Sequence, residues 1–442
     1  MEVISYSREI PVRDNVDVFV AGGGPAGISA ALVAARAGKS VFIAEAGACF
    51  GGMGTSGLIP VFMQFGDGIN FLAGGIGKEI YDKLNDLKGP NHPGGKASIP
   101  AELLKKLYDR LLVESGATIS LMTNVVDIVK EGPNVKQIIC QAKSGFFAIG
   151  AKMVIDGTGD GDIATWAGAP YEKGEPDTGE MMPGTLCSVW ADIDFDKFHE
   201  SQTNVREKLL ESFEKGDVFT VNDPHHPGMF RIGKHIAGGN IGHAFGVDST
   251  DEKSLTEHLV YARGHLHEFE NFYKKYIPGY ENVVLVQSGA LMGIRESRRI
   301  IGDYILDMDD FIARAIFDDE IGRYAYPVDI HPSKPDPVKY AAFEKEFFKV
   351  GRYGKGESYG IPYRCLTPKG LDNVLVAGRC VSTDRKVQGS LRVMPGCYIT
   401  GQAAGLAAAE AIDKNTTTRG IDVKILQKRL LDSGAFLPNA NL

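Results

Sequence analysis

The hydrophobic pattern near the N-terminal end predicts a strand, a helix and a second strand in close succession. The run VDVFVA at 16–21 is mostly apolar and stops at glycines, which is typical of a short strand buried in a parallel sheet. Segment 25–37 is rich in alanine, carries apolar residues at helical spacing and ends at Gly38, a common residue just past a helix. Because SVFIA at 40–44 predicts another strand, the pattern indicates a βαβ unit.

Regular elements are predicted to continue up to about residue 165. Helices are expected at 77–87 and, with clear amphipathic spacing, at 100–115. Strands are expected at 117–121, 125–130, 135–142, 146–149 and 152–155, with 125–149 as an antiparallel meander. The glycine-rich stretch 50–75 contains many apolar side chains, so we expect an ordered loop there.

The composition and the hydrophobic pattern of the chain change after residue 168. Aromatic residues, histidines and prolines become common between Gly168 and Pro362, and the βαβ rhythm disappears. A buried strand returns at 373–377 and is followed by a helix of small residues. The predicted fold class is therefore α/β: a Rossmann-type nucleotide-binding domain at 14–165, interrupted by an α+β substrate domain at 166–365 and completed by 366–442.

Composition excludes several classes of protein. A chain of 442 residues is long enough for two domains. The net charge is −8 and no lysine- or arginine-rich run occurs, so we expect no nucleic-acid partner. The six cysteines show neither C-x-x-C nor C-x-x-H spacing, so we expect no metal site and a reducing compartment. Without a signal-like start or an apolar run of about 18 residues, we expect a cytoplasmic protein with no membrane contact.

The first predicted strand leads into a dinucleotide fingerprint. Residues 22–27 carry G-x-G-x-x-G at Gly22, Gly24 and Gly27, and Glu45 ends the next strand. Gly22 allows a tight turn, Gly24 lets the backbone approach a pyrophosphate, and Gly27 lets helix and strand pack closely. The helix N-terminus would face the phosphates, and Glu45 would accept hydrogen bonds from ribose hydroxyls, which disfavours a 2′-phosphate. This pattern does not separate FAD from NAD.

Family resemblance favours FAD. The run DVFVAGGGPAGISAALVAARAGKSVFIAEAGACFGGMGTSG at 17–57 resembles the start of glutathione-reductase-type flavoproteins. IDGTGDGD at 155–162 is similar to their second nucleotide contact, and NVLVAGRCVSTDRKVQGSLRVMPGCYITGQAAG at 373–405 resembles their closing motif at the ribityl chain and flavin. With GIRESRR at 293–299, the chain most resembles the FAD-dependent oxidoreductase family, and more distantly the flavoprotein subunits of fumarate reductases and heterodisulfide reductases. The resemblance implies a glutathione-reductase-like fold with FAD as cofactor.

The resemblance also implies which residues contact FAD. A helix expected to begin near Gly401–Ala404 would offer its amides to the reduced flavin. Relatives often place an acid directly after the glycine that ends the last strand; this chain has Arg379 there, so either Asp384 substitutes or Arg379 contacts a phosphate. The implied set is Gly22, Gly24, Pro25, Ala26, Gly27, Glu45, Ala46, the glycine pair Gly51 and Gly52, Met53, Val125, Val126, Asp156, Gly157, Thr158, Gly159, Asp160, Gly378, Arg379, Asp384, Gln402 and Ala403.

Four residues are candidates for catalysis or substrate binding. Tyr363 and Arg364 lie on the return to the nucleotide domain, close to where the flavin is expected. Arg392 precedes the expected flavin helix, and Arg295 belongs to the cationic run 293–299. Two arginines on a cleft wall can clamp a carboxylate in bidentate fashion, so these residues indicate an acidic substrate.

Two polar clusters keep open alternatives. The arginines of 293–299 either face a substrate or pair structurally with Glu296, Asp303 or the FAD phosphates. His225 and His226, in the turn NDPHHPG, are either a general acid or base or part of a surface turn. No cysteine pair follows the glycine pair at 51–52, so thiol–disulfide exchange is disfavoured.

Three functions are compatible with the sequence. In the first, an enzyme transfers a hydride between flavin N5 and a small organic substrate such as a carboxylate. In the second, a flavoprotein subunit passes electrons to a partner redox protein. In the third, the nucleotide has only a structural role. We favour the first; the electrons then come from the substrate, from NADH at the flavin face or from a partner protein.

Overall fold

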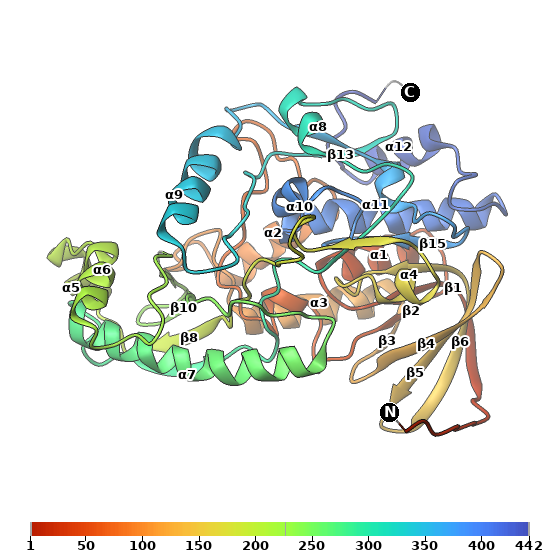
Figure 1. Ribbon diagram of the computed structural model, residues 1–442. Helices are drawn as coiled ribbons and strands as arrows, with labels where there is room; N and C mark the ends of the chain where they lie inside the picture. Colours follow the sequence, from red (N-terminus) through yellow and green to blue (C-terminus); the bar gives the residue numbers. More distant parts are fainter. Residues whose placement is uncertain (1, 226, 441–442) are drawn as a thin grey trace.

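The largest sheet in the computed structural model, which describes residues 2–225 and 227–440, is mixed and lies toward the lower right of the view in Figure 1. Its strands follow the order β3-β2-β1-β6-β5-β4, and β15 also pairs with β6. The pairs β1–β2, β1–β6, β2–β3 and β6–β15 are parallel, whereas β4, β5 and β6 form the predicted antiparallel meander. The bounds are β1 (Val12–Ala21), β2 (Val41–Ala44), β3 (Thr118–Ser120), β4 (Asn124–Glu131), β5 (Asn134–Ala142), β6 (Gly145–Asp156) and β15 (Val374–Val376).

The two ends of the chain build this domain together. Helix α1 (Pro25–Arg36) follows β1, and helix α11 (Met394–Asp413) comes from the C-terminal segment. The two helices lie against each other, and both contact β1 and β6. Helices α2 (Ile76–Lys88) and α3 (Ala101–Ser115) pack beside α1, while α12 (Val423–Asp432) packs on α11. The α/β class and the Rossmann-type start are therefore confirmed, with a last strand supplied by the C-terminal segment.

Segment 145–156 is one continuous strand, whereas the sequence predicts two. Its first residues pair antiparallel with β5, and its last three pair parallel with β15. Gly150 lies opposite Asn15 of β1, and a Cβ on Gly150 would lie 2.1 Å from the Asn15 Oδ1. The glycine therefore accommodates a neighbouring side chain and does not mark a turn.

The helix of small residues begins earlier than the sequence predicts. Helix α11 starts at Met394, so Gly401–Ala404 lie in its middle. A Cβ on Gly401 would lie 2.1 Å from the carbonyl oxygen of Ala26 in α1. The expected helix start near Gly401 is wrong because this glycine permits close contact between two helices rather than marking a helix end.

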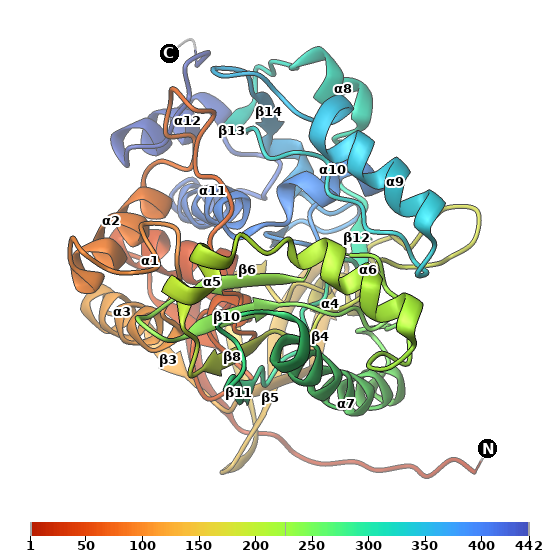
Figure 2. The same ribbon diagram turned by 90° about the vertical axis from the view of Figure 1, so that its left-hand side faces the viewer.

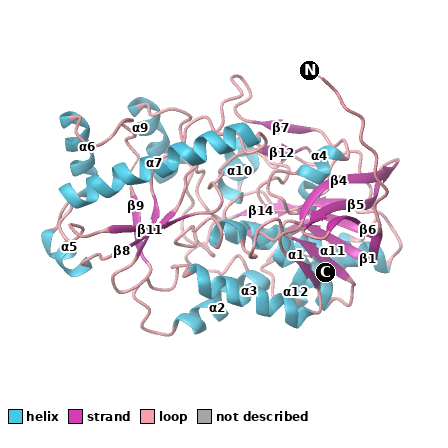
Figure 3. Ribbon diagram, turned by 90° about the horizontal axis from the view of Figure 1, so that it is seen from below, coloured by secondary structure: helices cyan, strands magenta, loops and turns pink. Residues whose placement is uncertain are grey.

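A second, smaller sheet lies at the other end of the molecule, beside the long helix α7 (Figures 2 and 3). Its strands are antiparallel in the order β11-β8-β10-β9. Its buried apolar side chains, which include Trp190 and Phe272, form a core separate from the main one. This unit is the α+β insertion expected between the two halves of the nucleotide domain. The bounds are β8 (Ser188–Ala191), α5 (Phe195–Ser201), α6 (Val205–Lys215), β9 (Gly228–Arg231), β10 (Ala237–Asn240), α7 (Glu252–Tyr276) and β11 (Val284–Ser288).

The chain after this unit packs into the main core, to which Tyr324 and Tyr359 belong. Two short antiparallel pairs occur here, β7 with β12 and β13 with β14. None of the helices in the described ranges combines the length and the apolar character that a membrane span requires. The remaining bounds are a 3-10 turn (Gly52–Gly54), α4 (Asp162–Trp166), β7 (Tyr171–Lys173), β12 (Arg298–Ile300), α8 (Met308–Ala313), β13 (Glu320–Tyr324), α9 (Pro337–Lys345), a π turn (346–350), β14 (Tyr359–Pro362), a 3-10 turn (Tyr363–Leu366) and α10 (Arg385–Leu391).

Candidate functional site

The glycine fingerprint lies between the end of β1 and the first turn of α1, as the sequence predicts. Gly22 has φ of +84°, and a Cβ on Gly27 would lie 1.9 Å from the Gly22 carbonyl oxygen, so both positions need glycine. A Cβ on Gly24 would have no atom within 4 Å, so the space in front of it is open. Pro25 begins the helix, and the amides of Ala26 and other first-turn residues have no carbonyl one turn earlier to bind. Free amides beside an open space suit a phosphate group.

A second glycine loop faces the fingerprint. The Gly51 amide donates to the Gly23 carbonyl over 2.7 Å, and φ is +111° at Gly51 and +49° at Gly52. A Cβ on Gly52 would lie 3.3 Å from the Gly24 Cα, so little room is left for a side chain at Gly52. The glycine pair and the fingerprint together form a cradle that can enclose a phosphate.

Glu45 lies at the end of β2, beside the fingerprint. Its carboxylate accepts hydrogen bonds from the amides of Gly23 and Gly47, each over 2.7 Å. Each carboxylate oxygen can accept more than one hydrogen bond, so ribose hydroxyls can donate to the same group. The Thr123 amide donates to the Glu45 carbonyl over 2.9 Å, which brings the next segment to this end of the site. The other residues expected here, Ala46, Val125 and Val126, lie in the adjoining loop and at the start of β4.

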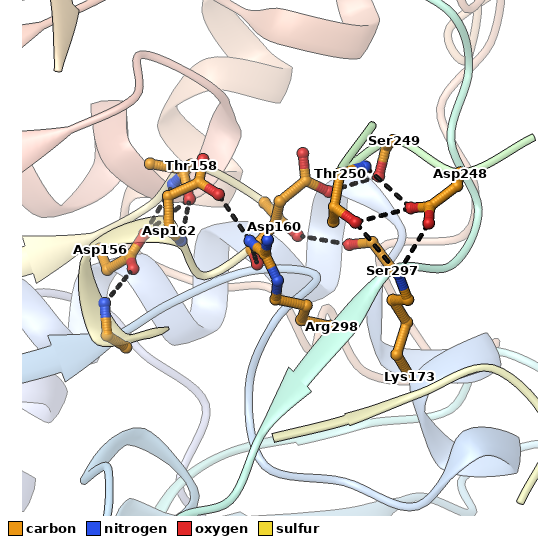
Figure 4. A network of polar contacts seen from close by, with 12 residues as sticks. Asp156, Thr158, Asp160, Asp162, Lys173, Asp248, Ser249, Thr250, Ser297 and Arg298 are labelled. Carbon is orange, nitrogen blue, oxygen red and sulfur yellow. Dashed lines mark hydrogen bonds and ion pairs between the residues drawn. The ribbon is translucent and has the colours of Figure 1, made fainter. Parts of the chain in front are cut away.

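The end of β6 forms a polar turn whose members are linked by hydrogen bonds (Figure 4). The buried carboxylate of Asp156 accepts from Thr158 Oγ1 over 2.7 Å and from the Ala164 amide over 2.9 Å. Burial raises the pKa of Asp156 to about 6. Asp160 accepts from Ser249 Oγ over 2.8 Å, which ties the turn to the inserted unit. Gly157 and Gly159, also expected at the cofactor, lie within this turn.

Arg379 connects segment 293–295 to this turn. Its Nη2 lies 2.7 Å from Asp160 Oδ1, and its Nε and Nη1 donate to the carbonyls of Gly159 and Ile294, each over 3.0 Å. Gly378, the residue before it, has φ of +87° at the end of β15. Arg379 thus has an acidic partner within the protein, and it fixes the segment that carries Arg295.

Several other predicted cofactor residues have structural partners. The Asp384 carboxylate caps α10 by accepting from the Val387 amide over 2.7 Å. Gln402 Oε1 accepts from the Ile76 amide at the start of α2 over 2.7 Å, and Ala403 beside it is fully buried. The FAD contacts predicted for Asp384, Gln402 and Ala403 stay predictions.

Two arginines of 293–299 also have structural partners. Arg298 Nη1 lies 2.7 Å from Asp162 Oδ1, and the buried Arg299 Nη1 lies 2.9 Å from Glu296 Oε1. Arg298 and Arg299 thus pair with acidic residues of the protein itself, as one of the two alternatives expected. Arg295, the third arginine of this run, lies in a different environment.

The start of α11 indicates where the redox ring of a bound flavin can lie. Met394 Sδ would lie 3.0 Å from a Cβ on Gly54, so the first turn of α11 meets the loop that begins with the glycine pair. Met53 in this loop reaches segment 293–295, because its Cε would lie 3.5 Å from a Cβ on Gly293. Helix N-termini carry free amides and partial positive charge, which suit the negative charge of a reduced flavin. The cradle, Glu45 and this helix start together fit FAD.

Two of the four predicted catalytic residues have partners outside this region. Tyr363 is buried, and its hydroxyl donates to the Thr418 carbonyl over 2.7 Å. Arg364 is about half exposed, and its Nε lies 2.9 Å from Asp319 Oδ2. Both side chains stabilise the junction between the 3-10 turn at 363–366 and neighbouring segments, so we do not assign them to the site.

The other two, Arg295 and Arg392, belong to one buried polar cluster. Arg392 comes just before α11, and its Nη2 lies 3.1 Å from Asp329 Oδ2. Arg295 is only 8% exposed, and its Nη1 donates to the Pro183 carbonyl and to Thr185 Oγ1, each over 2.9 Å. Within residues 2–225 and 227–440, no carboxylate lies at ion-pair distance from Arg295. A buried guanidinium without an anionic partner is costly, and an anionic ligand would relieve that cost.

Asp329 pairs with His331 as well as with Arg392, and His331 belongs to a group of three neighbouring histidines. His331 Nε2 lies 3.0 Å from Asp329 Oδ1, and His331 Nδ1 lies 3.1 Å from His243 Nε2. His243 Nδ1 lies 3.0 Å from Asp223 Oδ2, at ion-pair distance although not aligned as a hydrogen bond. His225 stacks on His243 with ring centroids 4.6 Å apart. Burial lowers the pKa of His331 to about 3 and also lowers that of His243, so both rings are neutral at pH 7.

Sequence reasoning did not bring these groups together. The histidines stand at 225, 243 and 331, and no short motif joins them. The available signal was the richness of the inserted segment in histidine, including His225 and His226 of NDPHHPG. His225 does join the cluster, whereas His226 lies outside the described residues.

A family model described as FAD dependent oxidoreductase matches residues 17–430. No curated protein matches the chain by sequence. A geranylgeranyl bacteriochlorophyll reductase-like protein from Thermoplasma acidophilum shares 15% identity over 94% of this chain and 82% of that chain, with a TM-score of 0.46. p-Nitrophenol 4-monooxygenase PnpA from Pseudomonas putida DLL-E4 shares 13% identity over 95% and 84%, with a TM-score of 0.44. L-Proline dehydrogenase from P. horikoshii shares 12% identity over 96% and 99%, with a TM-score of 0.41.

These solved structures are too distant to carry an argument about the substrate. The family model, by contrast, spans nearly the whole chain and includes the fingerprint, the glycine pair, the turn after β6 and the start of α11. FAD as cofactor and a redox enzyme as protein class are therefore confirmed. The chain belongs to the FAD dependent oxidoreductase family.

Proposed function

We propose that the enzyme oxidises or reduces a small organic acid whose carboxylate binds to Arg295. The supporting observation is the buried guanidinium of Arg295, whose hydrogen-bond acceptors are the neutral oxygens of Pro183 and Thr185. A substrate carboxylate would bring both the missing charge and two acceptor oxygens that match the guanidinium fork. Bound FAD supplies the hydride acceptor or donor of the reaction.

The charges next to Arg295 suit a single carboxylate. The Arg392 guanidinium donates to both the carbonyl and the carboxylate of Asp329, over 2.9 and 3.1 Å, so Asp329 neutralises it. Arg295, Arg392 and Asp329 together therefore carry one net positive charge. Because these groups are shielded from water, their attraction for one anionic group is stronger than at the surface.

Anaerobic reduction of the bound flavin tests this proposal. A panel of hydroxy acids and amino acids, each with its uncharged amide, is added to the protein while the flavin absorption band is followed. For the reverse direction, keto acids and unsaturated acids are added to chemically reduced protein. We expect one acid to change the band, whereas its amide does not.

Arg295→Gln supplies the matched comparison. It should retain FAD but raise the acid concentration for half-maximal bleaching about 10- to 150-fold, because charge-assisted hydrogen bonds contribute about 1.5–3 kcal/mol. Arg364→Gln, which removes a surface arginine paired with Asp319, should behave as the wild type. Equal response of Arg295→Gln and wild type would refute the assignment. A flavin that responds only to a partner redox protein would favour a flavoprotein subunit instead.

A further inference from the structure

We propose that His225, His243 and His331 bind one divalent transition-metal ion beside the flavin site. One ring nitrogen from each histidine lies within 4.8 Å of the other two. Neutral imidazole nitrogens are common ligands of zinc, iron, nickel and copper ions. Three protein ligands leave a coordination position for water or a substrate oxygen. The proposed metal site does not depend on which acid the enzyme uses.

The facing nitrogens of two rings are spaced as metal ligands are. His331 Nδ1 and His243 Nε2 lie 3.1 Å apart. Two nitrogens bound to a tetrahedral zinc ion at about 2.0–2.1 Å would be about 3.3 Å apart. The nitrogen of His225, within 4.8 Å of both, then has to approach by at most about 1.5 Å.

An oxygen atom lies beside one nitrogen of each of the three rings. The contacts are Asp329 with His331 Nε2, Asp223 with His243 Nδ1, and the Tyr340 hydroxyl with His225 Nδ1. Metal-binding histidines usually present their second nitrogen to a carboxylate or carbonyl in this way. If His243 Nδ1 and His331 Nε2, each 3.0 Å from a carboxylate oxygen, carry the ring protons, the facing nitrogens of the two rings present lone pairs to each other. A cation between them stabilises that arrangement.

The charges around the cluster permit a cation. The carboxylates of Asp223 and Asp329 lie 3.0 Å from ring nitrogens of His243 and His331, so negative charge lies next to two of the three rings. The charge of Arg295 reaches His243 and His331, so an anionic oxygen in the open coordination position would be favoured by both Arg295 and the ion. If the proposed function holds, the substrate carboxylate lies next to the metal.

Calorimetric titration of the FAD-loaded protein tests the site. The protein is first dialysed against a chelator and then titrated with zinc chloride, and the titration is repeated with cobalt. We expect one ion per chain. Removing a histidine should weaken binding more than removing a carboxylate behind it, which typically costs about 10- to 100-fold in metal affinity. His243→Gln and His331→Gln should therefore lower zinc affinity more than about 100-fold, and Asp223→Asn about 10- to 100-fold.

The control variant is His267→Gln, which changes an exposed histidine paired with Glu270 on α7 and should bind zinc as the wild type does. FAD content and melting temperature report whether each variant is folded. No stoichiometric binding by the wild type, or equal affinity of His331→Gln and wild type, overturns the proposal. Should the glutamine variants fail to fold, anomalous diffraction at the zinc edge from wild-type crystals decides. A peak between the three rings supports the site, and a peak elsewhere or none overturns it.

Discussion

Alanine at Gly24 should separate FAD binding from folding. The backbone at Gly24 has φ of −72° and ψ of −178°, which alanine adopts without strain. An added Cβ would have no protein atom within 4 Å. We therefore expect the free energy of unfolding of the FAD-free protein to change by no more than about 1 kcal/mol, because alanine is a poorer N-cap residue than glycine but lowers the entropy of the unfolded chain.

The same methyl group would occupy the space in front of the first turn of α1, where the pyrophosphate is expected. If it displaces the phosphate from one amide, the loss of one charge-assisted hydrogen bond costs about 1.5–3 kcal/mol. This corresponds to a dissociation constant for FAD raised about 10- to 150-fold. Titration of the FAD-free protein with FAD, followed by quenching of flavin fluorescence, measures the change.

Gly27→Ala is the opposite case. Its Cβ would lie 1.9 Å from the Gly22 carbonyl oxygen, so α1 would have to move away from β1. Such overpacking costs about 1–3 kcal/mol or more, and the melting temperature of the FAD-free protein should fall. Wild-type affinity of Gly24→Ala for FAD would show that the pyrophosphate does not lie over Gly24. Equal destabilisation by both substitutions would refute the steric reasoning.

Three further predictions concern stability. Tyr363→Phe leaves the Thr418 carbonyl unpaired, so denaturant titration should show a loss of about 1–3 kcal/mol without a change in substrate-dependent bleaching; lost bleaching would return Tyr363 to the site. Because burial raises the pKa of Asp156 to about 6, the folded protein keeps a proton that the unfolded chain releases near pH 4. The stability difference between wild type and Asp156→Asn should therefore shift against the wild type by about 2 kcal/mol as pH rises from about 4 to 6, and a constant difference would contradict this. Gly401→Ala should lower the melting temperature, since its Cβ would lie 2.1 Å from a carbonyl of α1. Gly264→Ala, which has open space around it on α7, should raise stability by about 0.5–1 kcal/mol. The reverse order of stability would contradict this steric explanation.

The nucleotide half of the molecule was predictable from local sequence. Each feature of this half depends on neighbours within a few positions: a run of apolar residues, a glycine turn and an alanine-rich helix. Such patterns can be recognised without knowing the fold. Glu45 belongs to the same local unit, because it directly follows β2, the strand that comes after α1. The structure has these elements within a few residues of the predicted bounds.

Predictions from local patterns were wrong where a glycine is required by a contact with a distant part of the chain. The sequence predicts separate strands on either side of Gly150 and a helix start near Gly401, yet each glycine makes room for a distant group, a side chain of β1 and a carbonyl of α1. At these two positions the local sequence does not show which neighbour requires a glycine.

The polar cluster depends entirely on long-range folding. Arg295 follows the inserted unit, Asp329 and His331 lie in a loop before α9, and Arg392 precedes α11. Their charges and hydrogen bonds interact strongly only when folding brings these residues within a few ångströms of one another and burial removes water. The fold of the cofactor domain thus follows from short stretches of sequence, whereas the proposed substrate site forms only where distant segments meet.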